Sequence, residues 1–187
     1  TIQSPTISEV SILLPTVTEL NVRSRNLRVD HQLTNVTHLK LEFDNFSNDD
    51  WIKFLPNVES LKIVQYSNST KAFQAIDLDV KELKHLKHLE ICDKFIWLVM
   101  GSMKSLFLTN VRLKSPLFLS SNNKIEYLRI DECRWVNDAF FEHVIESCVN
   151  LKTLIVTRAN ISTKIVEKFH KNCKGLKCFQ LINCTVT

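Results

Sequence analysis

The stretch that decides the fold is residues 125–187, which read IEYLRIDECRWVNDAFFEHVIESCVNLKTLIVTRANISTKIVEKFHKNCKGLKCFQLINCTVT. One pattern occurs nearly three times in it, beginning at Ile125, Leu151 and Leu176. In each copy apolar residues occupy relative positions 1, 4, 6 and 11, and a Cys or another small residue occupies position 9. Such self-similarity is typical of repeat proteins, in which neighbouring units stack to bury a shared core.

The spacing inside each copy predicts a short strand followed by a return segment. Positions 4 and 6 alternate along the strand, so their side chains point to one face and become buried. Two return segments have helical spacing, and Asn137 or Asp138 is placed to cap the first of them. The apolar stripes expected on these helices are Phe140, Val144, Ile145 and Cys148 in the first, and Ile165, Val166 and Phe169 followed by Cys173 in the second.

Four cysteines occupy repeated places in this pattern. Cys133 and Cys184 are at position 9, where a small, weak donor can meet backbone carbonyls inside the turn. Cys148 and Cys173 each end a return helix, three residues before the next position 1. This arrangement resembles the cysteine-containing subclass of leucine-rich repeats that F-box/LRR proteins carry, with the motif C-x-x-[I/W]-x-[D/T] and then C-x-x-L-x-x-L. The resemblance is good over residues 125–187 and looser before them.

The same apolar spacing continues back through the chain. First apolar positions at 17, 36, 58, 86, 103, 125, 151 and 176 indicate about eight irregular repeats. Only 17 residues separate 86 from 103, so we expect an extended or single-turn connection through 95–101 and no full helix. The resemblance implies an α/β leucine-rich repeat solenoid, with a curved parallel sheet on its concave side and helices and irregular turns on its convex side. We expect a single domain over residues 1–187, and a fragment of a longer protein because the chain opens in the middle of the pattern.

The strand period also predicts which side chains face a partner. With positions 4 and 6 buried, positions 3, 5 and 7 point to the concave face. The first repeats place basic side chains there, which form a basic end: Arg23, His38, Lys40 and Lys62. This basic end is either a contact patch or the ordinary polar surface of a solvated sheet face. The later repeats place apolar side chains beside an arginine, a combination typical of interaction hot spots: Phe107, Tyr127, Arg129 and Ile155. Exposed apolar side chains lower solubility unless a partner, or a tail or loop of the chain itself, covers them.

Composition excludes several function classes. Of the 187 residues 44% are hydrophobic, which excludes general disorder, and the net charge of +4 is not concentrated in a basic block. Two glycines, Gly101 and Gly175, are too few for a phosphate-cradling loop. The chain contains no apolar run long enough to span a bilayer, and its first residues have no basic segment of a signal peptide.

Catalytic and metal-binding constellations do not emerge. His143 and Cys148 lie five residues apart on one expected helix, which does not bring them within hydrogen-bonding reach as a nucleophile pair. Four residues could be considered as zinc ligands: His170, Cys173, Cys178 and Cys184. Their spacing departs from the C-x-x-C pattern of zinc sites, so we do not expect them to bind zinc. We therefore expect no enzyme activity, no metal and no cofactor.

The resemblance implies the role of a substrate receptor. In F-box/LRR proteins a short F-box binds the adaptor of a cullin-RING ubiquitin ligase, and the repeat arc selects the protein to be ubiquitinated. On that basis we expect a non-catalytic intracellular module, cytoplasmic or nuclear and without a membrane segment. It would bind a protein on its concave face, and a ligase adaptor through an F-box segment outside this chain.

Two other classes remain open. An RNA-export or ribonucleoprotein-type repeat module would use the basic end to contact phosphates or an acidic partner. A secreted, glycosylated receptor ectodomain would use some of the Asn-x-Ser/Thr sites, which are Asn35, Asn45, Asn68, Asn160 and Asn183. The cysteines argue against secretion, because four of the six are explained as repeat positions and not as a disulfide framework.

Overall fold

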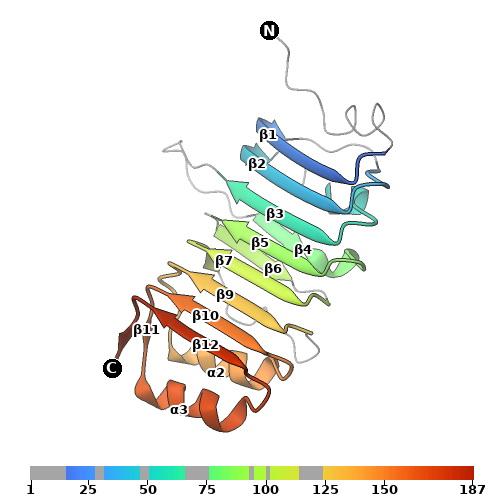
Figure 1. The fold of residues 1–187 in the computed structure, drawn as a ribbon. Helices are drawn as coiled ribbons and strands as arrows, with labels where there is room; N and C mark the ends of the chain where they lie inside the picture. Colours follow the sequence, from blue (N-terminus) through green and yellow to red (C-terminus); the bar gives the residue numbers. More distant parts are fainter. Residues whose placement is uncertain are drawn as a thin grey trace.

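The computed structural model describes residues 16–27, 32–46, 51–65, 76–92, 95–99, 102–113 and 124–187. Its centre is an eight-stranded parallel sheet, whose strands follow one another in chain order (Figure 1). The strands are β1 (Glu19–Leu27), β2 (His38–Phe46), β3 (Ser60–Gln65), β5 (His88–Cys92), β7 (Ser105–Thr109), β9 (Tyr127–Asp131), β10 (Thr153–Thr157) and β12 (Cys178–Ile182). The mixed α/β class and the eight parallel strands, one for each expected repeat, are confirmed.

The register of the main sheet aligns equivalent repeat positions of neighbouring strands. Neighbouring strands are aligned so that their position-4 residues meet, in the order Leu20, Leu39, Leu61, Leu89, Leu106, Leu128, Leu154 and Phe179. Position 6 forms a second row of Val22, Leu41, Ile63, Ile91, Leu108, Ile130, Val156 and Leu181. Both rows contribute to one hydrophobic core. A shift of one residue in the register of a strand would therefore move its buried side chains to the opposite face of the sheet.

The return segments form smaller elements. They include a three-stranded parallel sheet of β4 (Ile76–Asp79), β6 (Phe95–Val99) and β8 (Arg112–Leu113), and a two-stranded sheet of β11 (Asn160–Ile161) and β13 (Thr185–Val186). Short 3₁₀ helices are η1 (Trp51–Phe54) and η2 (Val80–Glu82). The extended connection expected through 95–101 is confirmed for Phe95–Val99, whereas Gly101 lies outside the described residues.

The two α-helices occur in return segments that are long enough to hold them. The helices α2 (Asp138–Ser147) and α3 (Thr163–Asn172) have ten residues each and lie side by side against the main sheet (Figure 1). They occur in the copies that begin at 125 and 151, where the spacing leaves room for a helix. The short connection from 86 to 103 contains β6 instead, because a strand spans more distance per residue than a helix does.

Helix α2 is capped as predicted, but its buried stripe is wider than predicted. The Asn137 side chain accepts a hydrogen bond from the backbone N–H of Phe140 at 3.0 Å. Phe141, which the predicted stripe omits, is completely buried, whereas Ile145 is only half-buried. The rings of Phe141 and Phe169 in α3 have centroids 6.0 Å apart and meet at 76°. The stripe prediction was wrong there because α3 covers a side of α2 that an isolated helix would leave in solvent.

Helix α3 follows its prediction more closely. The Ser162 side chain caps it by accepting a hydrogen bond from the backbone N–H of Ile165 at 3.3 Å. Ile165 and Phe169 are buried as expected, and Val166 is half-buried. The inward face of α3 therefore joins the core between the helices and the sheet.

Replacing Phe141 by alanine is expected to lower the free energy of unfolding by about 3–5 kcal/mol, because the change leaves a cavity between α2 and α3. Urea denaturation followed by circular dichroism measures the effect. The control is Glu146→Ala on the exposed side of the same helix, which should change the free energy of unfolding by less than about 0.5 kcal/mol. Equal effects of the two substitutions would show that Phe141 is not packed as described.

Candidate protein-interaction face and its rim

The face of the main sheet that carries positions 3, 5 and 7 is called the open face below. In β7, β9 and β10 burial alternates as predicted, with positions 4 and 6 buried and their neighbours half-buried. Val64 and Cys92 depart from the prediction, because each is only 9% exposed. They stand side by side at position 7 of β3 and β5, and the Cys92 thiol lies 3.7 Å from the Glu90 carboxylate. Their neighbours therefore shield both side chains from solvent.

The basic end, on β1 to β3, is matched by carboxylates. Lys40 Nζ lies 2.5 Å from one oxygen of Glu42, and Arg23 Nε lies 3.9 Å from the other. Lys62 Nζ donates a hydrogen bond to Glu90 at 2.6 Å. The structure thus places Arg23, Lys40 and Lys62 close to the positions predicted for them, but it pairs them with carboxylates to which the sequence analysis assigned no role. Little positive charge is left in excess at this end.

Phe107, Tyr127, Arg129 and Ile155 lie together on β7, β9 and β10, and are called the aromatic patch below. The Phe107 and Tyr127 rings are stacked, with centroids 5.0 Å apart and planes inclined by 27°. Phe107, Arg129 and Ile155 stand in register across the three strands. All four side chains are half-buried, so each keeps surface that a partner can cover. The structure therefore brings together the second predicted group of site residues.

Arg129 is held in place by hydrogen bonds on its own face. Its Nε donates to Asp131 Oδ2 at 2.7 Å, and Asp131 Oδ1 accepts a hydrogen bond from Thr157 Oγ1 at 2.8 Å. The hydrogen bond to Asp131 and the negative charge of that carboxylate raise the pKa of Arg129, so the guanidinium stays charged. A charged group that is already ordered loses little conformational freedom when a partner binds.

A second feature, which the repeat pattern did not predict, lies where these strands end. Position 8 has a left-handed backbone in four turns, with φ between 50° and 56°, at Asn110, Glu132, Arg158 and Asn183. In the first three of these turns the backbone N–H donates to the last carbonyl of the next strand of the main sheet, at 2.8 to 3.2 Å. These bonds hold neighbouring turns side by side, so that residues at positions 8 and 10 of successive repeats gather at one edge of the sheet.

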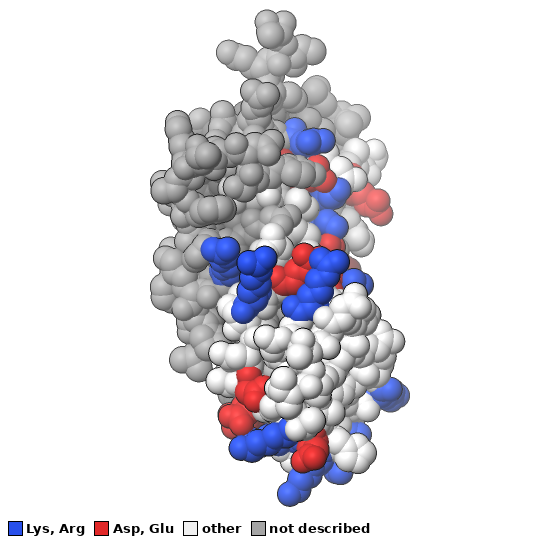
Figure 2. Space-filling model, turned by 90° about the vertical axis from the view of Figure 1, so that its left-hand side faces the viewer, with Lys and Arg blue, Asp and Glu red and all other residues white. Residues whose placement is uncertain are grey.

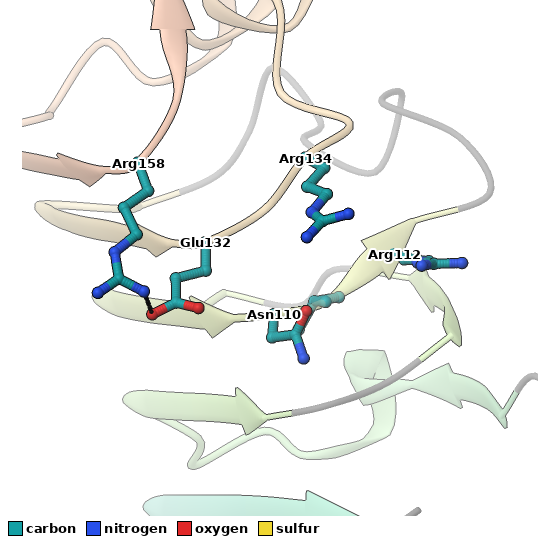
Figure 3. A pocket seen from close by; sticks show the side chains of 6 residues that line it. Asn110, Arg112, Glu132, Arg134 and Arg158 are labelled. Atoms are coloured by element: carbon teal, nitrogen blue, oxygen red, sulfur yellow. Dashed lines mark hydrogen bonds and ion pairs between the residues drawn. The ribbon is translucent and has the colours of Figure 1, made fainter. Parts of the chain in front are cut away.

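Three of these turns form a hollow of about 480 Å³, called the arginine hollow below and lined by Asn110, Val111, Arg112, Glu132, Arg134 and Arg158 (Figure 3). Arg158 Nη1 donates a hydrogen bond to Glu132 at 2.5 Å. Arg134 makes no hydrogen bond or ion pair with the part of the chain that the structure describes. The signal that could have revealed the hollow is the recurrence of arginine at position 10 of two successive repeats, Arg112 and Arg134.

The position-9 cysteines behave as the repeat pattern predicts. Cys133 Sγ lies 3.3 Å from the Asp131 carbonyl and 3.6 Å from the Leu108 carbonyl, and Cys184 Sγ lies 3.4 Å from the Val156 carbonyl. Both thiols therefore donate to backbone carbonyls inside the turns. Burial raises the pKa of the Cys133 thiol to about 11.

In the folded chain we expect iodoacetamide to alkylate Cys178 faster than Cys133 at about pH 8. Cys133 is 1% exposed, and its raised pKa keeps it in the unreactive protonated form, whereas Cys178 is half-buried on the open face. Mass spectrometry of peptides from timed reactions measures both rates. Urea should remove the difference, and equal rates in the folded chain would contradict the enclosed position of Cys133.

The residues considered for catalysis and metal binding have structural contacts. His143 Nδ1 lies 3.5 Å from Ser147 Oγ, and the backbone N–H of Cys148 donates to the Val144 carbonyl at the end of α2. Cys173 ends α3 in the same way. Across the described ranges, no group of three or more His, Cys, Asp and Glu side chains is arranged to hold a metal ion.

The glycosylation sequences differ in accessibility. Asn35, Asn160 and Asn183 are exposed. The side chain of Asn45 and the whole of Asn68 lie outside the described residues. The exposed asparagines alone do not distinguish a secreted chain from an intracellular one, because surface asparagines are common in both.

No family model matches the chain, and a search of curated proteins found no match. Among the residues that the structure describes, no helix is both long and apolar enough to cross a lipid bilayer. The function must therefore be argued from the open face and its rim.

Proposed function

We propose that residues 1–187 form a leucine-rich repeat solenoid of the cysteine-containing subclass, which serves as a non-catalytic protein-recognition module. The observation that carries this proposal is the register of the main sheet, which aligns the same two apolar repeat positions, 4 and 6, in every strand pair. The contacts of Cys133 and Cys184 with backbone carbonyls support the subclass. In such a protein each turn packs only on its neighbours, and an extended face is left for binding.

The size and chemistry of the open face support protein recognition. Eight parallel strands about 4.8 Å apart span roughly 35 Å. A surface of that width can supply one side of a standard protein interface, which buries about 800 Å² on each partner. The aromatic patch provides its anchor, because stacked Phe107 and Tyr127 offer apolar area beside the ordered charge of Arg129.

The role we favour is the substrate-binding arc of an F-box-type ubiquitin-ligase receptor. An F-box elsewhere in the full-length protein would bind the ligase adaptor, and the open face would hold the protein to be ubiquitinated. The cysteine pattern supports this role. All six cysteines are free thiols, which suits a reducing compartment such as the cytoplasm or the nucleus.

The alternative classes have less support. The RNA-binding alternative was predicted to use the cations of the basic end, and there Lys40 and Lys62 are paired with Glu42 and Glu90. A secreted repeat domain is commonly stabilised by disulfides, whereas the cysteines of this chain are free thiols.

The test is affinity purification of the full-length protein from its own cells, as the wild type and as Phe107→Ala/Tyr127→Ala. We expect at least one protein that co-purifies with the wild type to be lost from the variant. Its Kd for the purified chain should rise by about tenfold or more, because aromatic anchors at the centre of an interface carry much of its binding energy. Circular dichroism establishes that the variant is folded.

The matched control is Lys164→Ala/Lys171→Ala, which removes two exposed lysines of α3, outside the open face, and should retain the partner. Retention of every partner by the aromatic variant would refute the proposed binding surface. Recovery of a cullin and its adaptor with every bait supports the ligase role. Their absence would refute the F-box assignment and leave the recognition surface standing.

A further inference from the structure

We propose that the arginine hollow binds a phosphorylated side chain of the protein that contacts the aromatic patch. The identity of the partner rests on the proposed function. The affinity of the hollow for a phosphate group depends only on its own residues.

The hollow concentrates positive charge. Three arginines, Arg112, Arg134 and Arg158, line it together with one acidic residue, Glu132. In Figure 3 Arg158 and Arg112 lie at its two ends, with Arg134, Glu132 and Asn110 between them. Figure 2 views the molecule from the side toward which the strands of Figure 1 point, and shows basic side chains gathered around a small acidic area at mid-height. Among the described residues at this edge, an anion therefore meets more positive than negative charge.

The carboxylate does not neutralise the hollow. The side chains of Arg158 and Glu132 are 62% and 50% exposed, so their ion pair is weak and a doubly charged anion can replace the carboxylate. Arg134 makes no ion pair within the described part of the chain, so its N–H donors can turn to a ligand. The backbone N–H groups of Asn110, Glu132 and Arg158 already donate to carbonyls, so binding must use the side chains.

A phosphate monoester suits these groups better than a carboxylate does. Its charge at neutral pH is close to two, and it has three acceptor oxygens, so it can face two guanidinium groups at once. The planar fork of an arginine binds two of those oxygens together. Arg134, at position 10 of one repeat, and Arg158, at position 8 of the next, follow the adjacent strands β9 and β10, and both line the hollow. One phosphate can therefore be held between the two turns.

The hollow continues the aromatic patch along the same strands. In β7, β9 and β10 the patch residue at position 5 is followed three residues later, just past the end of the strand, by a residue of the hollow: Phe107 and Asn110, Arg129 and Glu132, Ile155 and Arg158. Three extended residues span roughly 10 Å. An extended partner segment of a few residues can thus contact the patch and place a phosphorylated side chain in the hollow, which favours a phosphoprotein over a small phosphate.

The test uses a degenerate peptide library with a fixed central phosphoserine, and the same library without phosphate, on the immobilised 187-residue chain. Enriched phosphopeptides should bind about tenfold or more tightly than their unphosphorylated forms. Arg134→Gln/Arg158→Gln should abolish most of that difference. The matched control, Lys174→Gln/Lys177→Gln, removes two exposed charges before β12 begins, and should change the affinity by less than about twofold.

Two outcomes would overturn the inference. One is equal affinity for the phosphorylated and unphosphorylated forms, and the other is an equal loss in the lysine variant, which would indicate unspecific attraction between charges. If the library enriches no peptide, O-phosphoserine is titrated into ¹⁵N-labelled protein. Movement of the Arg134 Nε–Hε resonance then supports the site, and an unmoved resonance refutes it.

The two proposals can fail separately. If Phe107→Ala/Tyr127→Ala loses its protein partner and Arg134→Gln/Arg158→Gln binds that partner with unchanged affinity, the recognition face stands and the phosphate site falls. If phosphopeptides bind the wild type but not the arginine variant, and the aromatic variant keeps every protein partner, the phosphate site stands and the aromatic patch falls.

Discussion

The structure depends on the burial of two apolar rows that run across all eight strands of the main sheet. One strand with its return segment has too little apolar surface to fold alone, so each is stabilised by its neighbours. Leu89 and Leu128, which have neighbouring strands on both sides, are completely buried. Strand β12 pairs only with β10 within the described residues, and its Phe179 and Leu181 stay half-buried.

The same stacking positions the polar groups. Lys87 donates to Glu59, and Lys152 to Glu126, each at 2.7 Å across neighbouring turns. These hydrogen bonds hold the pKa of both glutamates below the usual value. At the other edge of the sheet, the left-handed residues at position 8 repeat the geometry of one turn in the next. Arginines from separate repeats are thereby brought into one hollow beside the aromatic patch.

The strands, their alignment and the aromatic patch could be predicted because they follow from alternation along a strand, which is a local property. The thiol contacts of Cys133 could also be predicted, because position 9 lies inside the turn. The burial of Phe141 could not, since it depends on Phe169 in the next return segment. Val64, at a position predicted to be exposed, is buried beside Cys92, which only the pairing of β3 with β5 brings next to it.

Apolar spacing alone therefore suffices to define the repeating unit, the number of strands in the main sheet and the two faces of that sheet. Which charges pair is decided only by the tertiary structure, because an ion pair such as that of Lys62 and Glu90 depends on the distance across strands and not on separation along the chain. The arginine hollow required the tertiary structure for the same reason. Return segments of unequal length separate its arginines in the sequence, and only the stacked turns bring them to one edge.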